Sequence, residues 1–216
     1  TLAVETSEAF EVVVINGRAA RAARHRRNKA TSAIASAKAR CTKGSRRWRK
    51  LDRAEKKARD TSEKALRNID HQVTRKAANF AVEHRAGTVV AGDVRGIEQH
   101  TRQVARKRTG RHQRRRLSQW SRGRQERYLT EKTGVQITHI PEDYSSKTCP
   151  GCNRRNRPTG RNYQCRNCGF TCHRDAVGAL NILMRARYGT YQPIDPTRTI
   201  LVTYLRATPL PRKARS

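Results

Sequence analysis

The chain has 216 residues, of which 49 are Lys or Arg and 17 are Asp or Glu, so its formal net charge is +32. No apolar run reaches the ~18 residues of a membrane span, and no charged leader followed by an apolar stretch indicates a signal peptide. Because aromatic residues make up only 5% of the chain, it offers few anchors for a membrane surface, and nucleic acid is the expected polyanionic partner.

The N-terminal third divides into a β-rich and a helical part. Residues 1–6 and 10–15 predict a hairpin, and the second strand ends at the turn dipeptide Asn16-Gly17. Residues 18–67 hold 19 basic and 4 acidic residues, a net charge of 19 − 4 = +15, in a background of alanine. This composition predicts one or two solvated helices, broken near residues 42–45.

Further elements follow from apolar spacing. Apolar residues at helical spacing predict a helix that turns one stripe toward a core and ends at Gly87. The stripe consists of Leu66, Ile69, Val73, Ala77 and Phe80. Residues 88–91 predict a short buried strand, 102–127 a basic covering helix that runs on until Gly134, and 135–140 a second strand. A last apolar helix over residues 176–184 ends at Gly189, and the tail from Thr190 is predicted to be irregular, with a short strand at 200–202.

Four cysteines form two C-x2-C pairs separated by twelve residues: Cys149, Cys152, Cys165 and Cys168. This spacing is typical of a structural Zn²⁺ site with four thiolate ligands. The alternatives are disulfides and a redox-active C-x-x-C motif. Disulfides fit less well because no signal peptide is evident, and a redox motif fits less well because the C-x2-C pair is doubled. Cys172 or His173 is an alternative fourth ligand.

Three carboxylates stand at the ends of predicted elements. Asp93 and Glu142 follow the two later strands, and Asp175 begins the last helix. Carboxylates in such positions can converge on Mg²⁺, and paired ions of this kind cleave phosphodiesters. The plainer alternatives are a turn residue for Asp93 and a helix N-cap for Asp175.

Three motifs resemble the C-terminal part of TnpB-type proteins, the transposon-encoded RNA-guided DNA endonucleases related to type V CRISPR effectors. They are Tyr144-Ser-Ser-Lys-Thr-Cys-Pro-x-Cys152, Cys165-x-x-Cys168-Gly169, and His173-Arg-Asp-Ala-x-x-Ala-x-Asn-Ile182. The resemblance implies an α/β fold: an RNase H-like (RuvC) mixed sheet with covering helices, lacking its first strand, with an inserted zinc ribbon. It also implies a prokaryotic cytoplasmic protein with guide RNA and target DNA as partners.

The resemblance assigns the site residues by motif. Asp175 matches the Asp of the third RuvC motif, a metal ligand, and Asn181 matches a recurrent Asn of the same helix. The second motif usually carries Glu before Asp, and here the matching pair is Gly92-Asp93. We therefore expect Glu142 to supply the missing carboxylate for Mg²⁺, with Asp93 as second choice. The Asp of the first motif is not found, so we expect these 216 residues alone to be inactive.

The predicted organisation is a partial RuvC-like domain over 1–145 with its basic helical segment at 18–67, a zinc ribbon over 146–172, a RuvC-like helix over 173–189 and a basic irregular tail over 190–216. The leading function is RNA-guided DNA cleavage with Mg²⁺. The alternatives are a nuclease-dead relative that acts by occupancy and a basic zinc-ribbon RNA-binding protein such as a ribosomal component. Arginines expected to contact nucleic acid are Arg46, Arg47, Arg49, Arg114, Arg115, Arg154, Arg155, Arg157, Arg161 and Arg166.

Overall fold

The N-terminal hairpin forms as predicted. In the computed structural model, which describes residues 1–93 and 120–208, strand β1 (Leu2–Glu5) pairs antiparallel with β2 (Ala9–Asn16). The Thr6 hydroxyl closes the connection by hydrogen bonding to the backbone of Ala9 at 3.0 Å. Valine and isoleucine fill β2 because β-branched side chains pack well on a pleated surface.

The C-terminal tail contains a long strand, so the prediction of an irregular tail is wrong. Strand β7 (Thr199–Arg206) pairs parallel with β2 along its whole length and completes a sheet of order β1-β2-β7. The predicted short strand at 200–202 is its first part. Leu201 and Tyr204 on this edge strand are exposed, which explains why the tail lacks the continuous apolar pattern of a buried strand.

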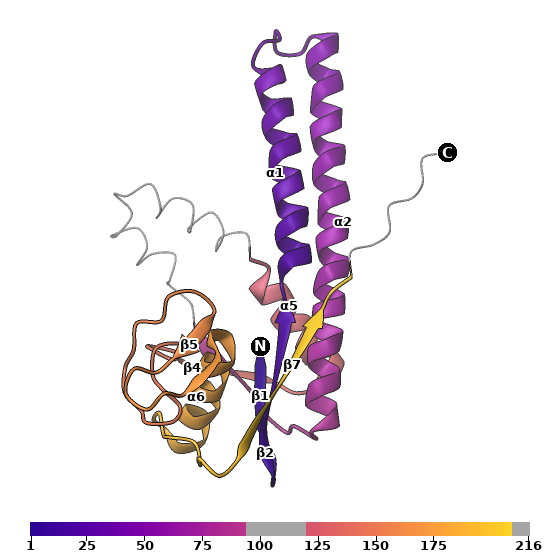
Figure 1. Cartoon of the computed structure of the whole chain (residues 1–216). Helices are drawn as coiled ribbons and strands as arrows, with labels where there is room; N and C mark the ends of the chain where they lie inside the picture. The colour runs from indigo at the N-terminus through magenta and orange to yellow at the C-terminus, as the bar shows by residue number, and fades with distance from the viewer. Residues whose placement is uncertain (94–119, 209–216) are drawn as a thin grey trace.

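The sheet lies between two helices (Figure 1). Alternate residues of β2 point to opposite faces, as strand geometry requires. On one face Glu11 lies 3.2 Å from His84, which follows α2 (Arg46–Glu83). On the other face the strand packs against α6 (Arg174–Tyr188), and the core there is formed by Phe10, Val12, Val14, Ala176, Leu180, Met184 and Ile194.

The basic segment forms a helical hairpin that projects beyond the sheet (Figure 1). Helix α1 (Arg18–Lys38) and α2 are separated at residues 39–45, which confirms the predicted break, and the Ser45 hydroxyl caps α2 by accepting a bond from the Trp48 amide. Helix α2 continues well past residue 67 and ends at Glu83, four residues before the predicted Gly87. None of the helices that the structure describes is both long and apolar enough to cross a membrane.

The predicted apolar stripe of α2 packs at the base of the hairpin, where its residues meet small residues of α1. Phe80 is only half-buried and lies against the His84 ring. Val73 packs at the edge of this core, and Ala77 is buried elsewhere on the helix. The buried members of this core are Ala20, Ala23, Leu66, Ile69 and Ala207.

Two further strands form a separate parallel pair. Strand β3 (Val89–Asp93) pairs with β4 (Ile137–Pro141), with Gly92 opposite Ile140. Both predicted strands therefore exist, although β3 is half-buried and includes Asp93. Helix α5 (Arg122–Thr133) precedes β4 and ends at Gly134 in a left-handed conformation, as predicted. The predicted basic helix over 102–127 does not run through residues 120–121, which precede α5 and are not helical, and its earlier part lies outside the described residues. The result is a mixed α/β fold.

A buried acid joins α2 to α5. The Asp70 side chain is fully buried and accepts hydrogen bonds from Ser121 (2.8 Å), Gln125 (2.7 Å) and Arg124 (2.7 Å). Arg124 also pairs with Glu63, and its two acidic partners outweigh the effect of burial and raise its pKa. Because a buried charge is tolerated only when it is paired, this network fixes how α5 sits on α2.

Replacement of Asp70 by Ala is expected to lower the free energy of unfolding by about 3–5 kcal/mol, because it leaves Arg124 and two further donors without their buried acceptor. Chemical denaturation followed by circular dichroism measures this loss. Asp60→Ala is the matched control on the same helix, since Asp60 is exposed and forms no ion pair among the described residues. We expect that change to stay within about 0.5 kcal/mol. Equal losses for the two variants would contradict a structural role for the network.

Candidate metal centre and carboxylate site

The cysteine-rich insert is held by short elements and turns. Strands β5 (Asn162–Gln164) and β6 (Thr171–His173) form an antiparallel pair, and an isolated bridge joins Thr148 to Arg155. Tyr163 fills the interior, donating its hydroxyl to the Lys147 carbonyl at 3.2 Å. So small a core contributes little stability, and a metal is the expected source of the remainder.

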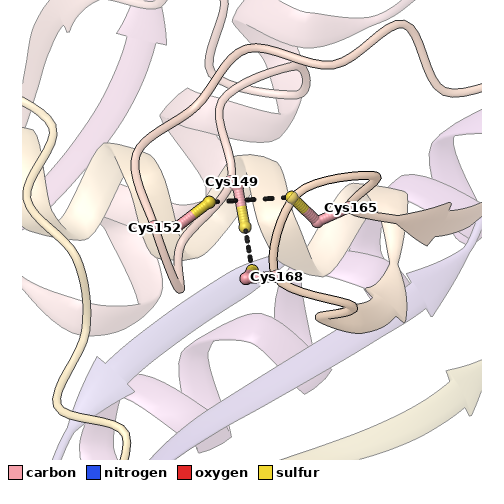
Figure 2. A group of neighbouring side chains, drawn as sticks. All are labelled: Cys149, Cys152, Cys165 and Cys168. Atoms are coloured by element: carbon pink, nitrogen blue, oxygen red, sulfur yellow. Dashed lines mark hydrogen bonds between the residues drawn. The ribbon is translucent and has the colours of Figure 1, made fainter.

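The four predicted cysteines converge on one point (Figure 2). All their sulfur atoms lie within 4.8 Å of one another, with Cys149 3.5 Å from Cys168 and Cys152 3.6 Å from Cys165. Tetrahedral Zn–S bonds of about 2.3 Å require sulfurs about 3.8 Å apart, so this set fits a zinc ion. Among the described residues it is the one group of three or more such donors, and it includes neither Cys172 nor His173.

Amide hydrogen bonds favour the thiolate form at Cys165, whereas burial opposes it at Cys149. Burial raises the pKa of the Cys149 thiol to about 12. Burial acts in the same direction on Cys165, but hydrogen bonds from the Cys168 and Asn167 amides outweigh it and lower the pKa of Cys165 to about 6. The Gly151 amide also points at the Cys149 sulfur, at 3.3 Å. Amides directed at sulfur stabilise thiolate, which is the form that binds Zn²⁺.

Glu142 lies against Gly92 at the end of β3. A Cβ atom placed on Gly92 would stand 2.8 Å from the Glu142 Cβ, 3.1 Å from its Cδ and closer still to its Oε2. As long as Glu142 keeps this position, only glycine fits at position 92, because a side chain there would collide with Glu142. The Glu142 carboxylate occupies the space beside this strand end that a residue-92 side chain would otherwise take.

Charges of both signs surround Glu142. Burial raises the pKa of this carboxyl, the Arg122 guanidinium lowers it, and the nearby Asp143 and Asp93 raise it. Arg122 is anchored by donating to the Gly92 carbonyl at 3.0 Å and to Glu126 at 2.6 Å. Asp93 is the last residue of β3 and not a turn residue. No sequence motif marks Arg122.

Asp175 lies in the first turn of α6 and is exposed. The N-cap role belongs to His173, whose Nδ1 accepts a hydrogen bond from the Asp175 amide at 3.2 Å. Asp175 lies close enough to Thr1, just before β1, for an electrostatic interaction between the two residues. Within the described part of the chain, Asp93, Glu142 and Asp175 do not form a group of three donors all within 4.8 Å.

Asn181 connects the segment after Glu142 to α6. Its side chain is fully buried and donates to the Ser145 carbonyl at 2.6 Å and to the Thr148 carbonyl at 2.8 Å. Arg174 reaches Ser146 from the same helix at 3.4 Å. The helix that carries Asp175 is therefore fastened to the turn that lies between Glu142 and the first cysteine.

The predicted nucleic-acid-binding arginines that the structure describes are all exposed. Arg46, Arg47 and Arg49 lie in the first turn of α2, at the end of the helical hairpin far from the sheet (Figure 1). Arg114 and Arg115 lie outside the described residues. The remaining members lie between the first and last cysteines of the cluster along the chain, namely Arg154, Arg155, Arg157, Arg161 and Arg166.

Part of this chain is similar to a known domain family. Residues 123–182, which run from α5 through the cysteine cluster into α6, match the model of the Cas12f1-like TNB domain. Among solved structures the chain resembles a cryo-EM structure of a Cas12f1–sgRNA–target DNA complex, with 19% identity and a TM-score of 0.48. That similarity covers 61% of this chain and 37% of the other. No curated protein sequence matches the chain.

Proposed function

We propose that the chain is the nuclease part of an RNA-guided DNA endonuclease, because residues 123–182 match the Cas12f1-like TNB domain and three of its motifs resemble those of TnpB-type proteins. It would hold a structural Zn²⁺ in the four-cysteine cluster and Mg²⁺ at a RuvC-like site of an RNase H-like fold. Glu142 and Asp175 would ligate the Mg²⁺. The proposal depends chiefly on one observation, the position of Glu142 against Gly92.

The contact explains how a glycine can stand where the family motif has glutamate. A carboxylate is still present at the end of β3, because Glu142 reaches it from the residue after β4. The parallel pairing of β3 with β4 brings the two strand ends together. The relocation therefore keeps a hard oxygen ligand near the strand end, which Mg²⁺ prefers, although the residue comes from another strand.

Asp175 is proposed as the second ligand because of the helix that carries it. Helix α6 packs on the three-stranded sheet, and Asn181 and Arg174 fasten it to the segment that follows Glu142. A bound Mg²⁺ would activate water and stabilise the leaving oxygen of the scissile phosphodiester. Asp93 lies close enough to influence the pKa of Glu142 and remains the second choice for its role.

The basic surfaces support nucleic-acid partners. Exposed arginines occur both at the end of the helical hairpin and in the cysteine-rich segment, which are well separated in the molecule. Separated basic surfaces are expected in a protein that contacts many phosphates of a nucleic-acid backbone. We propose guide RNA and target DNA as these partners. In such complexes base pairing reads the sequence and the protein holds the backbones, which requires positive charge without base-specific contacts.

The proposal is tested by expressing the protein from its own gene together with its RNA. We expect one defined RNA to copurify, and we expect cleavage of DNA that matches this RNA when Mg²⁺ is present and none with EDTA. Bulk ribosomal RNA as the only bound nucleic acid would contradict the proposal and favour the ribosomal-type alternative.

A second candidate is a nuclease-dead protein that acts by occupying its DNA target. The substitution of glycine for the motif glutamate at position 92 favours it. Guide-dependent binding of matched DNA without products in Mg²⁺ or Mn²⁺ would establish this alternative. If the site is catalytic, DNA cleavage products form in this assay, and the Asp175→Asn variant forms none.

A further inference from the structure

Tyr144 is an exposed aromatic residue next to the candidate catalytic carboxylate. It follows Glu142 by two residues and is 48% exposed. Its backbone has φ = 62°, in the left-handed region that a bulky side chain rarely adopts. Such conformations persist only where the surrounding structure enforces them, and they are frequent at binding sites.

The surrounding turn fixes this conformation. The Tyr144 carbonyl accepts hydrogen bonds from the Lys147 amide (2.8 Å), the Thr148 amide (2.9 Å) and the Thr148 hydroxyl (3.1 Å). Asn181 holds the same turn from α6 through the Ser145 and Thr148 carbonyls. The ring is therefore presented to solvent from a rigid support and not from a loose loop.

Two cations lie over the ring. The Arg155 guanidinium carbon is 3.9 Å from the ring centroid, and the Lys147 ammonium is 5.5 Å from it. The backbone bridge between Thr148 and Arg155 holds the arginine beside the tyrosine. Arg154, Arg155 and Arg157 are exposed, and none of them pairs with an acid among the described residues.

We infer that Tyr144, Arg155 and Lys147 form a binding site for one nucleotide of a single DNA strand. The base stacks on the free part of the Tyr144 ring, and its phosphate pairs with Arg155 and Lys147. Aromatic stacking combined with nearby cations is how proteins bind single strands without reading their sequence. We name this set the Tyr144 platform.

The choice of DNA as the ligand rests on the proposed function. The strand that is cleaved must pass Glu142, and the Tyr144 platform lies two residues away along the chain. A nucleotide held there would fix the register of the strand at the carboxylates. Such positioning lowers the barrier for cleavage by keeping the scissile phosphate in place.

Photocrosslinking tests the platform in the complex with guide RNA and target DNA. Iododeoxyuridine is placed at single positions in each DNA strand, or iodouridine in the RNA, and crosslinked peptides are identified by mass spectrometry. We expect a crosslink to Tyr144 from one DNA strand near the cleavage position. A crosslink to Tyr144 only from the RNA, or none from any position, would overturn the inference.

Binding of oligothymidine, measured by fluorescence anisotropy, gives the second test. Tyr144→Leu is expected to weaken binding about tenfold and Tyr144→Trp to preserve it, because stacking is worth about 1–3 kcal/mol per base. The matched control is Tyr188→Leu at the far end of α6, since Tyr188 is 51% exposed and lies 5.4 Å from the Arg187 guanidinium carbon. That variant should bind like the unmodified protein.

The measurements separate this inference from loss of fold and from the proposed function. Zinc content and the unfolding temperature are compared for all variants, and quenching of the Tyr144→Trp fluorescence by oligothymidine reports stacking even if Tyr144→Leu is unstable. Unquenched fluorescence would overturn the inference. A protein that crosslinks DNA through Tyr144 without cleaving it would contradict the proposed function alone.

Discussion

Replacement of Cys149 by Ser is expected to abolish stoichiometric zinc binding and to unfold the segment between Lys147 and Cys172. Structural zinc in small domains contributes about 10–16 kcal/mol of apparent binding free energy, far more than so small a core can replace. The expected unfolding extends to the start of α6, because Cys149, Tyr163 and Val177 share one buried cluster. Metal analysis by mass spectrometry and thermal unfolding with and without a chelator measure both effects.

Cys41→Ser is the matched control for this prediction. Cys41 lies outside the cluster, in the turn after α1, where its sulfur contacts the Ala37 carbonyl at 3.4 Å. Its replacement should leave zinc content unchanged and alter the free energy of unfolding by about 0.5 kcal/mol or less. Retention of one zinc per chain and of the unfolding temperature in Cys149→Ser would show that the four cysteines do not form the metal centre.

The metal centre was predictable from sequence because its ligands are local. Two C-x2-C pairs place two thiolates each within a single turn, so the spacing alone determines which sulfurs meet. The hairpin β1–β2 and the break between α1 and α2 were predictable for the same reason. A turn or a change of composition within a few residues determines each of them.

Long-range pairing was not predictable in the same way. Strand β7 forms by pairing with β2, whose residues lie 199 − 9 = 190 positions earlier in the chain, and no local pattern indicates that pairing. The partners of Asp70 are 51–55 residues away, and an acid on a basic helix usually remains in solvent. The left-handed backbone of Tyr144 also leaves no signal in a run of residues without glycine.

The carboxylate site lies between these cases. Motif resemblance identified Asp175 and the departure at Gly92-Asp93, and the end of the next strand suggested Glu142 as the replacement. The steric relation between Glu142 and Gly92 depends on the register of β3 against β4, which no motif contains. Metal ligation by Glu142 and Asp175 remains a prediction, and for Glu142 its strongest test exchanges the residues at positions 92 and 142.

Glu142→Gln is expected to lower guided DNA cleavage by roughly a thousandfold while leaving guide-dependent DNA binding within about twofold. Loss of one group that stabilises charge in a transition state costs about this much in rate. The amide keeps the shape of the side chain, so packing against Gly92 is preserved. Single-turnover cleavage and binding of matched DNA, measured on the same preparation, separate the chemical step from assembly.

Gly92→Ala tests the geometry without removing a carboxylate. The added methyl group would stand 2.8 Å from the Glu142 Cβ, so Glu142 must move away from the end of β3. We expect cleavage to fall by at least about tenfold, since displacement of a reacting group by about 1 Å is costly. Gly87→Ala is the matched control, because a Cβ on Gly87 meets no atom within 4 Å.

The exchange Gly92→Glu with Glu142→Gly places the carboxylate on β3 and removes the side chain that blocks it. If one carboxylate position near the end of β3 is what the site requires, this double variant should cleave faster than Glu142→Gln. Gly92→Glu alone should be as impaired as Gly92→Ala or more, because both side chains then compete for one space. Full activity of Glu142→Gln would instead assign the role to Asp93, and Asp93→Asn would then abolish cleavage.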